Sequence, residues 1–280
     1  MAALASALAA VVPSAVLQAS AHVEIAVIDT GADLSVPQLA ERHPLTYDTR
    51  THTANVHDGN GHGTLVASIV AASSGDARLL IIKAGNASGA FTDDAEATAI
   101  RYAIGHGARI INLSIGGSTT SPVERAAIAF AARSGALVVA PVGNDHALGD
   151  PVEYPAALLQ PVGSDGAGGS GLAVAASTAA GTRASFSGTG SWVSLAAPGV
   201  GVYGSLGRTR HGYGSGTSFA APQVAGAAAL VWAADPALTA HEVARILERT
   251  ASGRGTWNPD LGYGVIDVPA AIECAQARRQ

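Results

Sequence analysis

The segment "HVEIAVIDTG" at residues 22–31 contains the first of several short apolar runs that decide the fold. Residues 22–29 show little alternation of apolar and polar positions, which is typical of a parallel strand covered by helices on both faces. Further runs of this kind follow at residues 77–84, 108–115, 136–142, 171–177 and 192–197. Helical patterns alternate with them at residues 62–73, 92–107 and 121–135. We therefore predict an α/β fold with a three-layer, mostly parallel, doubly wound sheet flanked by helices in a single domain.

Two further helices are expected in the last third of the chain. Residues 219–234 are apolar nearly all round, which predicts a helix that runs through the core. Residues 239–251 are amphipathic, which predicts a peripheral helix. We expect the domain to span residues 22–273, preceded by a segment of small residues at 1–21 and followed by a short tail at 274–280.

Composition narrows the classes of function. The chain has 280 residues, 48% of them hydrophobic and 13% charged, with a net charge of −5. It has no cluster of basic residues apart from its last few, which argues against a nucleic-acid surface. Residues 1–21 are interrupted by Pro13 and predict no membrane span. This segment is read as a small-residue helix on the domain or as the remnant of a signal or pro-segment. Cys274 is the single cysteine, so no intrachain disulfide is expected.

Three polar residues lie where a parallel sheet places its chemistry. Asp29 ends an apolar run, His62 stands between glycines at the start of a helical pattern, and Ser218 lies in "GSGTSFAAP" at another helix start. Each alone is explained by a structural role such as helix capping. Together they supply a nucleophile, a base that takes its proton and an acid that orients that base. Asn144 follows the run at 136–142 and could donate a hydrogen bond to a developing oxyanion, together with the Ser218 N–H.

The chain resembles the subtilisin-like serine proteases (subtilases) over about residues 22–273. The matching pieces include "VIDTG", "GHGTLVA", "INLSIGG", "EYPAA", "GTSFAAPQVAGAAAL" and "LGYGVIDV". The resemblance implies that Asp29, His62 and Ser218 form the catalytic triad and that Asn144 is the oxyanion donor. It also implies an edge segment that pairs with the substrate backbone, made of Ser114, Ile115, Gly116 and Gly117.

The implied activity is hydrolysis of polypeptides by a serine endopeptidase through an acyl-enzyme. Two alternatives remain open at this stage. A dedicated processing peptidase or peptide ligase would share every catalytic residue, and a pseudoenzyme would bind peptides on the same scaffold without cleaving them. We expect a monomer that is secreted or otherwise extracytoplasmic and that needs no cofactor.

Departures from the family pattern predict properties of this particular chain. The helix after His62 ends in a tight "SSGD" turn, and Gln38 stands where the family carries a carboxylate. We therefore expect the usual high-affinity calcium site to be absent and predict no metal ligands. Glu153 lies near the expected base of the P1 pocket, where it would favour Lys or Arg unless it is turned out to solvent.

Two aromatic residues and the small residues around Ser218 complete these expectations. Phe91 resembles the aromatic wall of the P4 pocket. Phe219 follows the nucleophile where many relatives carry methionine, and Met1 is the chain's only methionine, so tolerance to peroxide is expected. Gly214, Gly216 and the alanines of "GSGTSFAAP" are expected to leave space for a substrate carbonyl to approach Ser218 and its N–H.

Overall fold

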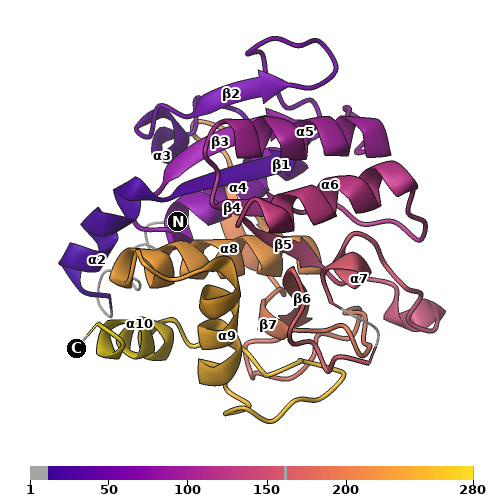
Figure 1. Ribbon diagram of the computed structural model, residues 1–280. Coiled ribbons are helices and arrows are strands. Elements are labelled where there is room, and N and C mark those ends of the chain that lie inside the picture. The colour runs from indigo at the N-terminus through magenta and orange to yellow at the C-terminus, as the bar shows by residue number, and fades with distance from the viewer. Residues whose placement is uncertain (1–11, 161–162, 280) are drawn as a thin grey trace.

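The computed structural model describes residues 12–160 and 163–279 and shows a seven-stranded, wholly parallel sheet between layers of helices (Figure 1). Its strand order is β2-β3-β1-β4-β5-β6-β7. The strands are β1 (Glu24–Asp29), β2 (Leu45–Asp48), β3 (Arg78–Lys83), β4 (Ile110–Leu113), β5 (Leu137–Pro141), β6 (Gly171–Ser177) and β7 (Leu195–Pro198). The predicted fold class is therefore confirmed.

The two faces of the sheet pack into separate cores, which explains why the strands lack alternation. In β1, Ile25 and Val27 join a cluster with helices α4 (His62–Ser73) and α8 (Thr217–Ala234). Ala26 and Ile28 point the other way, into a cluster with α5 (Asp93–Gly105) and α6 (Pro122–Arg133). Since side chains alternate between the two faces of the sheet and both faces are buried, all residues between Glu24 and Asp29, the two ends of β1, are apolar.

The helix that begins at the candidate nucleophile lies in the middle of the first core. Nearly all residues of α8 after its first turn are buried, and Trp232 near its end is 1% exposed. The predicted core helix is thereby confirmed. The amphipathic helix α9 (Ala240–Thr250) packs against α8 and starts with a capping box between Thr239 and Glu242.

A two-stranded antiparallel hairpin precedes α8, formed by β8 (Val202–Ser205) and β9 (His211–Gly214). Gly204 of this hairpin faces α4, where a Cβ would stand 2.2 Å from Leu65 Cδ1. The hairpin therefore lies directly against the helix that carries His62. The remaining elements are η1 (Ser20–His22), α3 (Pro37–Ala40), η2 (His146–Leu148) and α7 (Ala156–Leu159).

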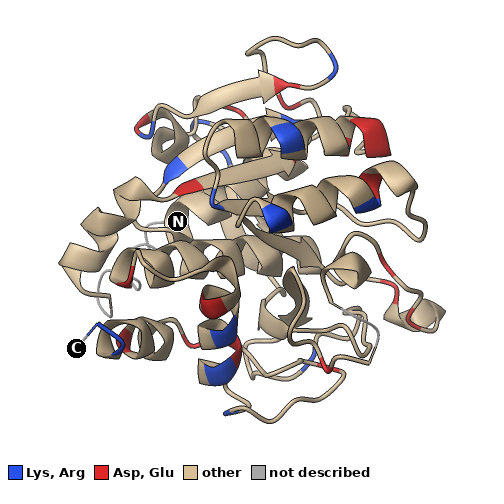
Figure 2. Cartoon of the chain, in the orientation of Figure 1, with Lys and Arg blue, Asp and Glu red and all other residues tan. Residues whose placement is uncertain are grey.

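The segments at the two ends of the chain are partly described. Helix α2 (Ser14–Ala19) packs on α8 with Val16 buried, whereas residues 1–11 of the expected N-terminal segment lie outside the described residues. The last helix, α10 (Val268–Ala277), continues into the segment expected as a tail. Among the described helices, none combines the length and hydropathy that crossing a bilayer requires. Figure 2 shows Lys and Arg scattered over several elements, with Asp and Glu among them.

The C-terminal end of α4 is closed by an arginine. Helix α4 ends at Ser73, and the chain turns sharply before β3. The Arg42 guanidinium donates to the carbonyl oxygens of Ala71 at 2.6 Å and Ala77 at 2.7 Å, and also to that of Gly75. One side chain therefore binds a carbonyl group in the last turn of α4, where intrahelical partners are missing, and two more in the turn that leads to β3.

Candidate active site

The predicted catalytic residues gather at the carboxyl edge of the sheet. Asp29 is the last residue of β1, and Asn144 follows β5. His62 is the first residue of α4, and Ser218 lies in the first turn of α8. Because ligand sites of doubly wound sheets lie beyond the carboxyl ends of the strands, the fold itself brings these four residues to one side of the molecule.

Asp29 and His62 form a hydrogen-bonded pair in which the carboxylate is buried and the imidazole is half-buried. His62 Nδ1 lies 2.8 Å from Asp29 Oδ1 and 3.0 Å from Oδ2, and Asp29 is 1% exposed. The carboxylate accepts from Nδ1, so that nitrogen carries the proton and Nε2 is left as a base. Burial works to lower the pKa of His62, but the charge of Asp29, its hydrogen bond and the charge of Asp58 outweigh burial and raise it.

Ser218 is half-buried in the first turn of α8, and the next residue, Phe219, lies against His62. The Phe219 ring lies 5.3 Å from the His62 ring, centroid to centroid. The Ser218 carbonyl oxygen accepts a hydrogen bond from Ser114 Oγ at 3.0 Å, which ties the nucleophile's backbone to the end of β4. Within the described residues the Ser218 hydroxyl has no hydrogen-bond partner, and catalytic hydrogen bonds are often long in unliganded enzymes.

Asn144 presents its amide nitrogen toward the site. Its Oδ1 accepts from the Thr217 backbone N–H at 2.9 Å and from Thr217 Oγ1 at 3.1 Å. Because Oδ1 is engaged by these donors, the exposed Nδ2 is the free end of the amide. The Asn144 amide therefore lies at the positive end of α8, where negative charge is stabilised.

Glu153 is buried between two glycines. It is 8% exposed and is therefore not turned out to solvent. A Cβ at Gly116 would stand 2.9 Å from Glu153 Oε2, and one at Gly143 would stand 2.5 Å from Glu153 Cγ. Burial, a hydrogen bond with Asp145 and the charge of Asp145 raise the pKa of Glu153. Glycines at both positions thus leave the room that this carboxyl group occupies.

Of the predicted substrate-binding segment, Ser114 and Ile115 are buried, whereas Gly116 and Gly117 are exposed. Gly117 pairs with Tyr154 through two backbone hydrogen bonds of 3.0 and 2.8 Å, so one side of the segment Ser114–Gly117 is already paired. Phe91 is half-buried, and a Cβ at Gly85 would stand 2.6 Å from its Cζ.

One local expectation about the site differs from the structure. A Cβ at Gly214 would stand 2.6 Å from Phe219 Cε2. Gly214 therefore makes room for the Phe219 ring rather than for a substrate carbonyl.

A set of hydrogen bonds around the Asp29–His62 pair could not be predicted from the sequence. Thr30 donates its N–H to Asp29 Oδ1 at 2.7 Å, and its hydroxyl donates to Asp58 Oδ1 at 2.9 Å. The only local signal for these contacts is that Asp58 opens the motif "DGNGHGT" before α4.

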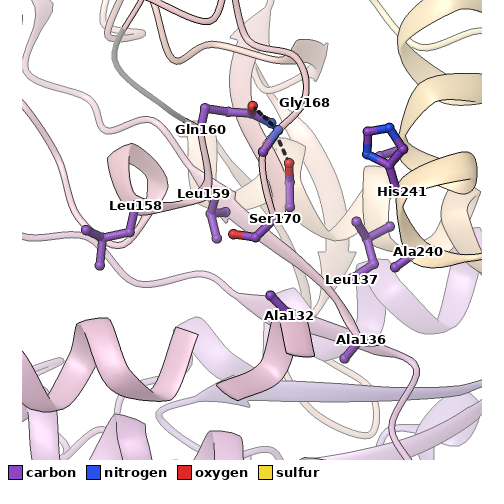
Figure 3. Close-up of a pocket in the computed structure, with 13 residues that line it drawn as sticks. Ala132, Ala136, Leu137, Leu158, Leu159, Gln160, Gly168, Ser170, Ala240 and His241 are labelled. Atoms are coloured by element: carbon purple, nitrogen blue, oxygen red, sulfur yellow. Dashed lines mark hydrogen bonds between the residues drawn. The ribbon is translucent and has the colours of Figure 1, made fainter. Parts of the chain in front are cut away.

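A separate pocket of about 550 Å³ lies away from these residues (Figure 3). It opens at Leu137 and Gly171, the first residues of β5 and β6, and therefore at the amino edge of the sheet. The Gln160 amide that lines it already binds Gly169, Gly171 and Ser194. The pocket's position at the opposite edge excludes it as the catalytic cleft.

Comparisons with known proteins agree with this geometry. The Subtilase family model matches residues 20–264. The chain is 36% identical to a thermophilic serine proteinase of Bacillus sp. (strain AK1), over 92% of this chain and 63% of that protein. It is 34% identical to a subtilisin of Bacillus pumilus, over 90% of this chain and 91% of that protein.

Solved structures show the same fold. Fervidolysin from Fervidobacterium pennivorans, a keratinolytic enzyme, superposes with a TM-score of 0.78 at 27% identity, over 91% of this chain and 43% of that one. A lanthipeptide protease superposes with a TM-score of 0.79 at 22% identity, over 90% of this chain and 87% of that one, a likeness of fold alone. With the family model covering most of its length, the chain belongs to the subtilase family of serine peptidases.

Proposed function

We propose that this chain is a serine endopeptidase that hydrolyses polypeptides through an acyl-enzyme. The observation that carries the proposal is the hydrogen-bonded Asp29–His62 pair at the same edge of the sheet as Ser218, which lies in the first turn of α8, while the Asn144 amide nitrogen has no hydrogen-bond partner among the described residues. Each of these groups has the type and place that acyl transfer requires.

In the proposed reaction, Ser218 Oγ attacks the scissile carbonyl carbon while His62 Nε2 takes the hydroxyl proton. The carbonyl oxygen becomes an oxyanion, which accepts hydrogen bonds from Asn144 Nδ2 and the Ser218 N–H. The carbon–nitrogen bond then breaks, and His62 gives its proton to the leaving amine. Water attacks the acyl-enzyme with His62 again as the base, which releases the acid product and restores Ser218.

Asp29 supports both halves of this cycle. Its carboxylate keeps the proton on Nδ1 and stabilises the imidazolium that forms when Nε2 is protonated. The raised pKa of His62 expresses the same stabilisation of the charged ring. Because Asp29 is buried at 1% exposure, water does not compete for its hydrogen bond with the ring.

We propose that extended peptides bind by strand addition along Ser114–Gly117. Gly117 is already paired with Tyr154 on one side, so the other side of the segment is available to a substrate main chain. Main-chain pairing accepts any extended sequence, and selectivity is then left to side-chain pockets. Phe91 is proposed to form the wall of the P4 pocket.

We propose that Glu153 selects Lys or Arg at P1, the residue before the scissile bond. Its carboxyl group is buried between Gly116 and Gly143, beside Asp145. Among the described residues, no Lys, Arg or His forms a salt bridge with Glu153. Burial and a second carboxyl group both disfavour the charged form of Glu153. A cationic P1 side chain would relieve both effects, whereas an apolar one would leave them.

We propose that the enzyme works without calcium. The Arg42 guanidinium already supplies a cation to the carbonyl groups at the end of α4. The described residues contain no group of three or more His, Cys, Asp or Glu suited to hold a metal ion. A monomeric, extracytoplasmic enzyme remains our expectation.

Labelling with a fluorophosphonate tests the activity. The wild type should be modified once, at Ser218, and the Ser218→Ala variant should not react. An unreactive wild type, or equal modification of Ser218→Ala, would support the pseudoenzyme and end the proposal. Product analysis with an added amine nucleophile then separates hydrolysis from peptide ligation.

Profiling with a peptide library tests the substrate class. Wild type should prefer Lys and Arg at P1, and Glu153→Gln should lose that preference while still cleaving peptides with apolar P1 residues. A wild type without a basic preference would refute the role of Glu153 and leave the peptidase proposal intact.

A further inference from the structure

The Asp58 carboxylate lies at the centre of a hydrogen-bond cluster behind the catalytic pair. Its Oδ1 accepts from Asn60 N at 2.9 Å, Gly61 N at 2.9 Å and Thr30 Oγ1 at 2.9 Å. Its Oδ2 accepts from Thr64 N at 2.8 Å and Thr64 Oγ1 at 2.6 Å. These donors come from three places along the chain: the turn after β1, the loop just before α4 and the first turn of α4.

Thr30 links this cluster directly to Asp29. The Thr30 hydroxyl donates to Asp58 and accepts from the Gly63 N–H at 3.0 Å, while the Thr30 N–H donates to Asp29 Oδ1 at 2.7 Å. A Cβ at Gly63 would stand 2.2 Å from Gly31 O, so the two segments meet backbone to backbone. The residues on both sides of His62 are therefore held to the turn that carries its carboxylate partner.

We infer that Asp58 is a positioning residue that holds the His62 imidazole in register with Asp29 by joining Thr30 to the start of α4. The inference rests on the proposed peptidase function. Its physical basis is that β1 and α4 are distinct elements, and a hydrogen bond between their side chains stays productive only while their ends keep a fixed distance and angle. Loss of that register by a fraction of an ångström weakens catalysis steeply.

The negative charge of Asp58 also supports the Asp29–His62 pair. Burial alone would raise the pKa of Asp58, but the hydrogen bonds from Thr64, Gly61 and Asn60 outweigh it and keep the carboxyl group ionised. The resulting negative charge helps Asp29 to raise the pKa of His62.

Other charged groups nearby must be considered in a test based on pH. Lys83 on β3 donates its ammonium to Thr30 O at 3.0 Å and to His57 O at 2.5 Å. Asp33 lies beyond Thr64, whose hydroxyl accepts the Asp33 N–H at 3.0 Å. From α8, the uncharged ring of Phe219 faces His62, with the ring centroids 5.3 Å apart.

The Asp58→Asn variant tests the inference on enzyme whose wild type is labelled by the fluorophosphonate. An amide keeps the size of the side chain but removes the charge and half of its acceptor capacity. We expect kcat to fall about tenfold to a hundredfold, because slight misplacement of the His62 imidazole slows the chemical step. KM should be nearly unchanged. The acid limb of the kcat/KM profile should move to lower pH, because His62 loses a charge that stabilises its protonated form.

Asp33→Asn is the matched control. It removes a carboxylate near the same turn but breaks no hydrogen bond between Thr30 and α4, so kcat and the acid limb should both stay at their wild-type values. A residue with only a structural role would lower the melting temperature without moving the acid limb. An Asp58→Asn enzyme with wild-type kcat and a wild-type acid limb would overturn the inference.

If Asp58→Asn does not fold, a second pair of variants at Thr30 tests whether the link between Asp58 and the turn after β1 positions His62. Thr30→Val has nearly the shape of threonine but loses the hydroxyl, whereas Thr30→Ser keeps it. We expect Thr30→Val to lower kcat and to shift or broaden the His62 Nδ1 proton resonance, and Thr30→Ser to restore both. Equal kcat in the two variants would overturn the inference, whereas a wild type that the fluorophosphonate does not label would overturn the proposed function instead.

Discussion

Replacing Arg42 with alanine should destabilise the fold without touching the catalytic residues. The Arg42 guanidinium donates to Ala71 O at 2.6 Å, to Ala77 O at 2.7 Å and to Gly75 O. The Ala71 carbonyl group lies in the last turn of the helix that begins with His62, where carbonyl groups lack intrahelical partners, and Gly75 and Ala77 lie in the turn between that helix and β3. Alanine offers no donor in their place.

The structure sets the size of the expected loss. Each hydrogen bond to a charged group contributes about 1.5–3 kcal/mol when buried. Arg42 is only half-buried, so water can replace part of each bond, and about 1 kcal/mol per bond is the better figure. Three bonds then give a loss of roughly 3 kcal/mol in the free energy of unfolding. For a chain of this size about 2 to 3 °C per kcal/mol applies, hence a drop of roughly 6 to 9 °C in melting temperature.

Thermal unfolding followed by fluorescence at a fixed scan rate measures this drop, and the half-life of activity at one temperature checks it kinetically. Arg278→Ala is the control, because Arg278 makes one ion pair with Glu242 at 2.6 Å in which both side chains are exposed. That pair should contribute less than about 1 kcal/mol. Arg42→Lys should fall in between, since one ammonium cannot reach three carbonyl groups. An Arg42→Ala melting temperature within about 2 °C of Arg278→Ala would refute the reasoning.

The same measurement in EDTA tests independence from calcium. The wild type should keep its melting temperature in EDTA, because the end of α4 already holds the Arg42 cation. A fall in EDTA would show that a metal ion stabilises the fold and would contradict the calcium-free proposal.

Four further outcomes are expected. Asn144→Ala should lower kcat about a hundredfold to a thousandfold with little change in KM, the cost of losing one oxyanion donor; an unchanged kcat in steady-state kinetics would contradict its role. Wild type should keep its activity in mild peroxide because the Phe219 ring stands beside His62, whereas Phe219→Met should lose activity over time; loss in the wild type would count against this. The preference for Lys over Leu at P1 should grow as pH rises through the raised pKa of Glu153, because only the ionised carboxylate attracts a cation, and this slope should vanish in Glu153→Gln. Burial and the neighbouring Glu124 raise the pKa of Glu96 from 4.5 to about 8. The contribution of the protonated Glu96 to stability is therefore complete below pH 4.5 and is lost as pH rises toward 8. Glu96→Gln should unfold at a higher temperature than the wild type at pH 9 but not at pH 5, and melting temperatures of the two proteins that change in parallel with pH would refute this.

Elements with strong local signals could be predicted from the sequence. The apolar runs that became β1, β3, β4, β5 and β6 are continuous because both faces are buried. β2 was missed because Leu45–Asp48 is a short edge strand with half-exposed residues. The β8–β9 hairpin was missed because its strands are rich in glycine and partly polar, which reads as a turn.

By itself the sequence determined the fold class, the order of Asp29, His62 and Ser218, and their places at the ends of strands and helices. Those features depend on hydrophobic periodicity and short motifs, which are local. Only the tertiary structure decided that Glu153 is buried, that Arg42 reaches the end of α4 and that Asp58 reaches the turn after Asp29. Each depends on a contact between segments far apart in the chain, where side-chain direction and packing choose the partner and no local pattern records the choice.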